Sequence, residues 1–177
     1  MTKKNKIVAV FGSSKTGEGN EYFDFAEQIG KTAAELGLTV ANGGYNGTML
    51  ASAKGAASAG GHIIGVTCTA FARAGANEYI KENISTDCLE KRLKTLIDIA
   101  DAYVVLPGST GTLLELAHVW ESKNKGFLPA RKPVIIAGNF FKPLIDLIEK
   151  IDPGSSNTLE FADTPEKVTQ ILKQSFK

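Results

Sequence analysis

The sequence predicts a doubly wound α/β fold with a parallel sheet. Short apolar runs alternate along the chain with segments of helical periodicity, and most runs are apolar at every position rather than at every second one. Such runs are typical of strands buried on both faces, and a helix between successive strands makes the strands parallel. The length of 177 residues fits one domain, so we expect a single domain over residues 1–177.

Strand and helix signals alternate in the first half of the chain. The predicted strands are the apolar runs KIVAVF, LTVA and HIIGV, at residues 6–11, 38–41 and 62–66. The helices between them are predicted at residues 21–36, which has one apolar face, and at 48–59, which is rich in alanine. Gly37 and Gly60 mark the two helix ends. Residues 67–86 show no clean period and predict an irregular loop with a short helix or strand.

The second half continues the alternation. Apolar residues at helical spacing from Leu89 to Ala100 predict a helix, and the run AYVVL at 102–106 predicts a buried strand. The remaining predicted helices are residues 113–123, 143–150 and 165–176. The remaining predicted strands are KPVIIA at 132–137 and a short strand near 159–162.

Charge and composition exclude several classes of function. The net charge of +1 gives no field that would attract nucleic acid, and no segment approaches the roughly 20 apolar residues that span a bilayer. The basic N-terminus leads into a predicted strand rather than a signal sequence, so we expect a cytoplasmic protein. Cys68, Cys88, His62 and His118 match no metal or redox spacing. We therefore expect no metal, no cofactor, no nucleic-acid partner and no membrane association.

Three glycine-rich segments each follow a predicted strand. The carboxyl ends of parallel strands meet at one edge of the sheet, where such folds bind ligands, so the three segments are expected to lie together. Gly108 to Thr112 leads from a strand directly into a helix, whose free N–H groups and dipole favour an anion such as a phosphate. The alternative is a tight strand-to-helix turn that is capped by threonine and binds no ligand.

The other two glycine-rich segments are less specific. Gly12 to Gly17 has the glycine spacing of a P-loop, but Glu18-Gly19 stands where that motif needs Lys-Ser/Thr, which argues against an NTPase. Asn42 to Gly47 is only loosely similar to GxGxxG and follows the second strand, and a purely structural turn explains it equally well. The chain also lacks room for a substrate domain, which disfavours an NAD-type oxidoreductase.

The segment from Pro107 to Glu115, PGSTGTLLE, closely resembles the PGGxGTxxE signature of the LOG (Lonely Guy) family, once widely labelled lysine decarboxylases. The resemblance extends over most of the chain. Gly12-Ser13-Ser14 matches the family's first loop, the segment 42–49 resembles its GGGxxGxM motif, and Arg92 precedes the segment 100–102 at the family's spacing.

The resemblance implies a Rossmann-like homodimer that binds nucleoside 5′-monophosphates or a similar phosphorylated small molecule. Characterised members, of the cytokinin-activating type, cleave the N-glycosidic bond to free base and ribose 5-phosphate. Carried over by position, Arg92 and Glu115 are the catalytic pair. A carboxylate can stabilise an oxocarbenium-like centre or activate water, and an arginine can hold a phosphate or ribose. The predicted nucleotide- or phosphate-binding residues are Gly12, Ser13, Ser14, Gly43, Gly44, Asn46, Gly47, Thr48, Pro107, Gly108, Ser109, Thr110, Gly111 and Thr112.

Both catalytic residues also have a structural interpretation. Glu115 can stabilise a helix dipole from the first turn of its helix. Arg92 can belong to a solvated charged face, because charged residues surround it in the sequence.

Departures from the family pattern favour a second class of function. Ser109 replaces a glycine and brings a Cβ into a crowded loop, Leu93 stands where many members have lysine, and Asn42 and Leu50 replace glycines beside the middle motif. The alternative is a non-catalytic protein that binds or carries a nucleotide or the molybdenum cofactor on the same anion-binding loops. A pyridoxal-phosphate decarboxylase is not supported, because no lysine lies in a recognisable cofactor site.

Overall fold

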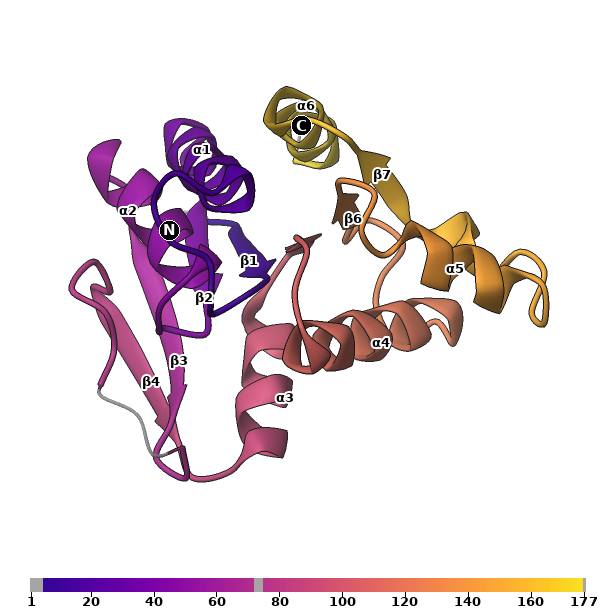
Figure 1. The fold of residues 1–177 in the computed structure, drawn as a ribbon, viewed down its shortest axis with the longest axis horizontal. Coiled ribbons are helices and arrows are strands. Elements are labelled where there is room, and N and C mark those ends of the chain that lie inside the picture. Colours follow the sequence, from indigo (N-terminus) through magenta and orange to yellow (C-terminus); the bar gives the residue numbers. More distant parts are fainter. Residues whose placement is uncertain (1–4, 72–74, 177) are drawn as a thin grey trace.

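The computed structural model describes residues 5–71 and 75–176, which form a parallel sheet with helices on both faces (Figure 1). Its strands are β1 (Ile7–Phe11), β2 (Thr39–Asn42), β3 (Ile63–Cys68), β4 (Glu82–Thr86), β5 (Ala102–Val105), β6 (Val134–Ala137) and β7 (Glu160–Ala162). Its helices are α1 (Glu21–Glu35), α2 (Thr48–Ser58), α3 (Leu89–Ile99), α4 (Thr110–Asn124), α5 (Lys142–Glu149) and α6 (Pro165–Ser175), with a short 3-10 helix η1 (Ser155–Thr158). The predicted doubly wound fold and single domain are confirmed.

The strand order explains where a ligand can bind. The sheet runs β4-β3-β2-β1-β5-β6-β7, and every neighbouring pair is parallel. From β1 the chain first extends the sheet toward β4 and then returns to add β5 on the other side. Such a reversal leaves a crevice at the carboxyl ends of the central strands. The three glycine-rich loops follow β1, β2 and β5, which are neighbours at this reversal.

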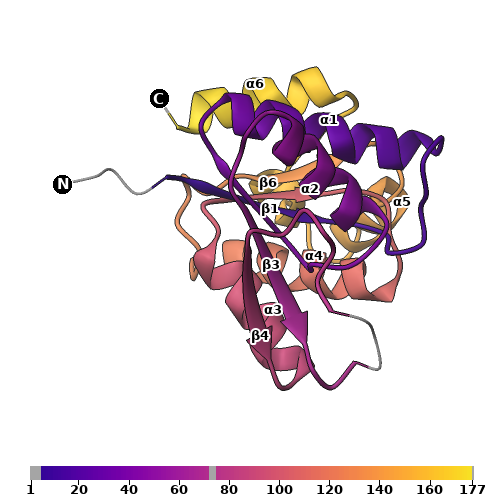
Figure 2. The same cartoon turned by 90° about the vertical axis from the view of Figure 1, so that its left-hand side faces the viewer.

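The two faces of the sheet have separate cores. In β1, Val8 and Val10 face the core beneath α1, α2 and α6, whereas Ile7, Ala9 and Phe11 face the core beneath α3, α4 and α5. Figure 2 shows α1 and α6 on one side of the sheet and α3 on the other. The interior strands are therefore largely apolar, because both of their faces are covered.

Close packing of α1 against α2 depends on two glycines. A Cβ at Gly30 would lie 1.9 Å from the carbonyl oxygen of Ser52, and one at Gly55 would lie 1.9 Å from that of Glu27. The small side chains predicted for α2 thus allow it to approach α1 as well as the sheet. The N-terminus of α1 is fixed by the side chain of Asn20, which accepts a hydrogen bond from the N–H of Tyr22 at 3.0 Å.

The segment 67–86, predicted as an irregular loop with a short helix or strand, contains the end of β3 and the edge strand β4. Most side chains of β4 are exposed, so it lacks the apolar run that marks the other strands. Residues 72–74 of this segment lie outside the described residues, as do residues 1–4 of the basic N-terminus and residue 177 of the predicted domain.

Candidate active site

The loops after β1, β2 and β5 enclose a cavity of about 240 Å³ together with the N-terminal halves of α3 and α4. Of the predicted site residues, those that line it are Gly12, Ser14, Gly43, Arg92, Ser109, Thr110, Gly111, Thr112 and Glu115. The structure therefore brings the predicted catalytic pair and parts of all three loops to one place. The side chains that complete the wall are Val10, Phe11, Tyr45, Met49, Phe71 and Leu89.

Arg92 lies on α3, and its side chain is buried in the cavity wall. Nε donates a hydrogen bond to the carbonyl oxygen of Val66 at 2.8 Å. The ring centroids of Tyr45 and Phe71 lie 5.8 and 5.7 Å from Cζ, within cation–π range. The residue is only 8% exposed, so its interpretation as part of a solvated charged face is wrong. A buried guanidinium that lines a cavity is suited to hold an anion.

Glu115 lies on α4 and faces Arg92. One carboxylate oxygen is 3.8 Å from Nη1 of Arg92, and the Glu115 side chain is 12% exposed. Burial raises the pKa of Glu115 to about 7, and the positive charge of Arg92 opposes part of this rise. Glu115 can therefore exchange a proton near neutral pH, as a general acid or base requires.

The structural interpretation of Glu115 does not hold. We expected α4 to begin at residue 113, which would place Glu115 in its first turn, but the helix begins at Thr110. Its first turn contains no acidic residue, and Glu115 lies in the second turn. Because the effect of the helix dipole fades beyond the first turn, dipole stabilisation does not account for this carboxylate.

The N-terminus of α4 forms part of the cavity wall. Ser109 is the N-cap residue, and its side chain makes no capping hydrogen bond. Its φ of −90° and ψ of −160° are open to any residue, and its side chain is exposed, so the expected crowding by its Cβ is not observed. Space is also open at Gly111, where an added Cβ would meet no atom within 4 Å. The first N–H groups of this helix are therefore accessible to a phosphate.

Several predicted binding residues hold the loops together instead of lining the cavity. The backbone N–H of Ser13 donates to the carbonyl oxygen of Pro107, and its own carbonyl accepts from the N–H of Thr48. A Cβ at Gly108 would lie 2.1 Å from Oγ1 of Thr112, so glycine is required there. Their contact with a ligand stays a prediction. The predicted residues that do not line the cavity are Ser13, Gly44, Asn46, Gly47, Thr48, Pro107 and Gly108.

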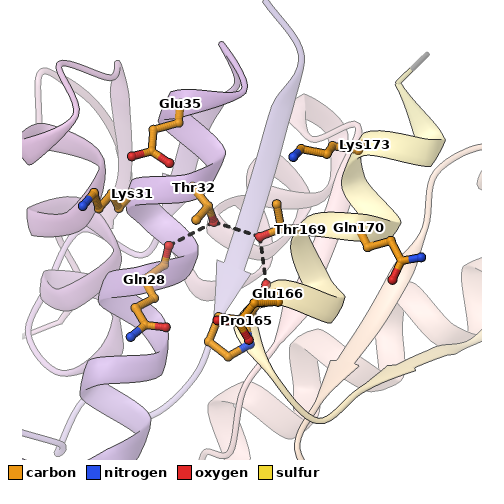
Figure 3. Close-up of a pocket in the computed structure, with 9 residues that line it drawn as sticks. All are labelled: Gln28, Lys31, Thr32, Glu35, Pro165, Glu166, Thr169, Gln170 and Lys173. Carbon is orange, nitrogen blue, oxygen red and sulfur yellow. Dashed lines mark hydrogen bonds between the residues drawn. The ribbon is translucent and has the colours of Figure 1, made fainter.

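A larger, more open groove of about 620 Å³ lies between α1 and α6 (Figure 3). The hydroxyls of Thr32 and Thr169 are 3.1 Å apart and link the two helices across it. The residues that line the groove are half-buried or exposed, and none is a predicted site residue. This surface lacks the buried charged pair that characterises the cavity at the strand ends.

Two further searches cover only the part of the chain that the structure describes. Within residues 5–71 and 75–176, no three His, Cys, Asp or Glu side chains are grouped so that they could hold a metal ion. None of the helices in these ranges is both long enough and apolar enough to cross a membrane.

Comparison with known sequences finds one family over most of the chain. A model of the SLOG cluster4 family matches residues 5–167. The cytokinin riboside 5′-monophosphate phosphoribohydrolase of Rhodococcoides fascians is 29% identical over 81% of this chain and 74% of its own. The protein of the same name from Mycobacterium tuberculosis is 34% identical over 66% of this chain and 62% of its own.

Comparison with solved structures supports the fold. The molybdenum cofactor binding protein from the phototrophic bacterium Rippkaea orientalis has a TM-score of 0.81 over 99% of this chain and 100% of its own. The two sequences are 22% identical, so this likeness shows a shared fold and carries no conclusion about the ligand.

Proposed function

The chain belongs to the SLOG cluster4 family, and on that premise we propose that it is a nucleoside 5′-monophosphate phosphoribohydrolase. The resemblance to the LOG family is confirmed by relatives named as phosphoribohydrolases that match over most of the chain. The observation that carries the proposal is that Arg92 and Glu115 form a buried pair in the same cavity as the exposed N-terminus of α4. The helix N-terminus could bind the phosphate of a nucleotide, and the adjacent carboxyl group, which titrates near neutral pH, could transfer protons while the glycosidic bond is hydrolysed.

In the proposed reaction, the nucleotide phosphate binds the free N–H groups of α4 and the hydroxyls of Ser109 and Thr110. Arg92 donates from its Nη groups to phosphate or ribose oxygens. Within the described ranges, the only hydrogen bond of its guanidinium comes from Nε, so both Nη groups remain for a ligand. Arg92 thus holds the substrate in a fixed orientation.

Glu115 performs the proton transfers in this proposal. Its carboxylate accepts a proton from a water molecule whose oxygen attacks C1′ of the ribose. The bond between C1′ and the base nitrogen breaks, and its electron pair moves to the base. The proton on Glu115 then passes to that nitrogen, so the products are a neutral base and ribose 5-phosphate. A pKa of about 7 lets Glu115 act first as a base and then as an acid.

The test is to incubate the purified protein with AMP, GMP, CMP, UMP and an N6-substituted AMP, and to measure free base and ribose 5-phosphate. Glu115→Gln and Arg92→Ala should each lower base release by about 100-fold or more. Matched controls on the same helices are Glu121→Gln and Lys94→Ala, whose exposed side chains form ion pairs with Lys125 and Asp98, four residues further along the chain. These controls should retain the activity of the unmodified protein.

Absence of base release from every substrate would contradict the proposal. If the melting temperature of that inactive protein still rose with a nucleotide or with molybdenum cofactor, the result would favour the alternative of a binding or carrier protein.

A further inference from the structure

We propose that Tyr45 is a positioning residue of this site. Its ring supports the guanidinium of Arg92, and its hydroxyl fixes the ring to the end of β3. This inference rests on the proposed function in one respect, because it takes Arg92 as the group that holds the phosphate or ribose of the substrate. Tyr45 itself is 6% exposed and acts through Arg92.

The hydroxyl of Tyr45 is held by both backbone groups of one residue. It accepts a hydrogen bond from the N–H of Cys68 at 2.9 Å and donates one to the carbonyl oxygen of Cys68 at 3.2 Å. Cys68 is the last residue of β3, a strand that is flanked by β2 and β4. It therefore lies at the carboxyl ends of the strands, where the cavity is. Two bonds to a rigid strand leave the ring little freedom to turn.

The backbone of Tyr45 is fixed as well. The side-chain amide of Asn77 donates to the carbonyl oxygen of Tyr45 at 2.8 Å, and the backbone N–H of Asn77 donates to that of Gly44 at 2.8 Å. The loop after β2 is thereby tied to the loop between β3 and β4. Both ends of the tyrosine are consequently anchored to elements other than the helix that carries Arg92.

The guanidinium of Arg92 needs such support. Its Nε bond to Val66 fixes one edge, but the 3.8 Å separation from Glu115 is too long for a hydrogen bond. The ring of Tyr45 lies 5.8 Å from Cζ, and the ring of Phe71 lies 6.2 Å from that of Tyr45 at a tilt of 44°. The aromatic contact stabilises the charge while the Nη donors stay available to a ligand. A hydrogen-bonding partner in its place would compete with the substrate.

The test compares Tyr45→Leu, which removes the ring, with Tyr45→Phe, which keeps the ring and removes the two hydrogen bonds to Cys68. The matched control is Tyr79→Leu, at a half-buried tyrosine that does not line the cavity. The first measurement is made on the free protein by NMR. The Nε–Hε signal of Arg92, identified by its loss in Arg92→Lys, should exchange with water about tenfold faster in Tyr45→Leu and severalfold faster in Tyr45→Phe. Tyr79→Leu should leave the exchange rate unchanged.

The second measurement is the affinity for ribose 5-phosphate by calorimetry, since this product is not turned over. Tyr45→Leu should weaken binding about tenfold in the native background and have no further effect in Arg92→Ala, because both changes remove the same support. A merely structural role would weaken binding equally in both backgrounds and would overturn the proposal. So would an Arg92 signal that keeps its exchange rate in both Tyr45 variants.

The design separates this proposal from the proposed function. If the protein releases no base and binds no ribose 5-phosphate, the phosphoribohydrolase proposal fails, while the Arg92 signal still decides the role of Tyr45. If Tyr45→Leu does not fold, Tyr45→Phe decides, and an unchanged exchange rate in that variant contradicts the proposal.

Discussion

At the scale of single residues, burial raises the pKa of Glu115 and carries a cost in stability. Its pKa is about 7 in the folded protein, against 4.5 for an unperturbed glutamate. Between these two values the folded state keeps a proton that the unfolded state has lost, so the free energy of unfolding falls as the pH rises. The cost is absent below pH 4.5 and reaches about 3 kcal/mol above pH 7.

Glu115→Gln should therefore stabilise the protein, and more so at alkaline pH. We expect the gain in free energy of unfolding to be about 2 kcal/mol larger at pH 8 than at pH 5, because glutamine carries no charge to bury. Urea unfolding of both proteins at the two pH values measures this difference. Glu121→Gln, an exposed change on the same helix, should show no such gain. An equal effect of Glu115→Gln at both pH values would contradict the assigned burial cost.

Gly43→Ala tests the close fit around Arg92. An added Cβ would lie 1.9 Å from Nη2 of Arg92 and 2.6 Å from Sδ of Met49, so the guanidinium must move. We expect base release to fall at least about tenfold, since small misplacement of a positioning group is costly. Gly17→Ala, whose methyl would meet nothing within 4 Å, is the control. Retained activity in Gly43→Ala would show that Arg92 tolerates displacement.

Some departures from the LOG pattern have a structural explanation that sequence alone does not provide. The side-chain amide of Asn42 donates to the carbonyl oxygen of Met49 and to the hydroxyl of Ser52, and its oxygen accepts from the N–H of Gly44. Leu93 is buried in the core beneath α3. These residues stabilise the loop and the helix around the cavity.

The sequence predicts site residues best where one short segment contains all the features of the motif. The loop before α4 combines glycines, hydroxyls and a helix start, which is enough to predict an anion site. Tyr45 and Phe71 gave no such signal, because their partner Arg92 comes from a distant helix and Phe71 lies in a segment without periodicity. The spacing of residues within a motif does not predict a contact between a loop and a helix that are far apart in the sequence.

At the scale of elements, the contact between α1 and α2 should be sensitive to a single methyl group. Gly30→Ala would place a Cβ 1.9 Å from the backbone of α2, and backbone cannot yield as a flexible side chain does. We expect a loss of about 2 kcal/mol in stability, larger than the gain of about 1 kcal/mol that alanine gives a helix. Thermal unfolding beside Gly17→Ala measures it. An unchanged or raised melting temperature would mean that the helices can separate at low cost.

Two elements depart from the sequence patterns that predict strands and helices. β4 is a mostly exposed edge strand, so its sequence lacks the continuous apolar run that predicted the interior strands. The sequence predicts the start of α4 too late, because glycine and threonine are poor helix formers and the first turn of this helix is formed by the segment Thr110-Gly111-Thr112.

At the scale of the whole molecule, the alternation of strands and helices predicts the parallel sheet and the edge where the loops meet. It does not predict which strands are neighbours. The order β2-β1-β5 at the centre is what brings the three glycine-rich loops together, and this order depends on packing between distant segments. The sequence therefore predicts that the site lies at the carboxyl ends of the strands. It does not predict which side chains line the cavity, because these come together only in the folded chain.

The last prediction concerns assembly, for which the LOG resemblance implies a homodimer. Helix α5 lies on the face of the sheet that also carries α3 and α4 (Figure 1). Leu147 on this helix and Ile151 just beyond its end are 58% and 87% exposed. Exposed apolar side chains of this size are costly in water and are typical of an interface, so we predict that a second copy of the chain covers this face.

Light scattering should give about twice the 18.8 kDa of one chain. Leu147→Glu and Ile151→Glu should shift the protein toward monomer, because each would bury a charge without a partner. Gln170→Glu, on α6 at the opposite face, should leave the mass unchanged, and a monomeric native protein would contradict the prediction.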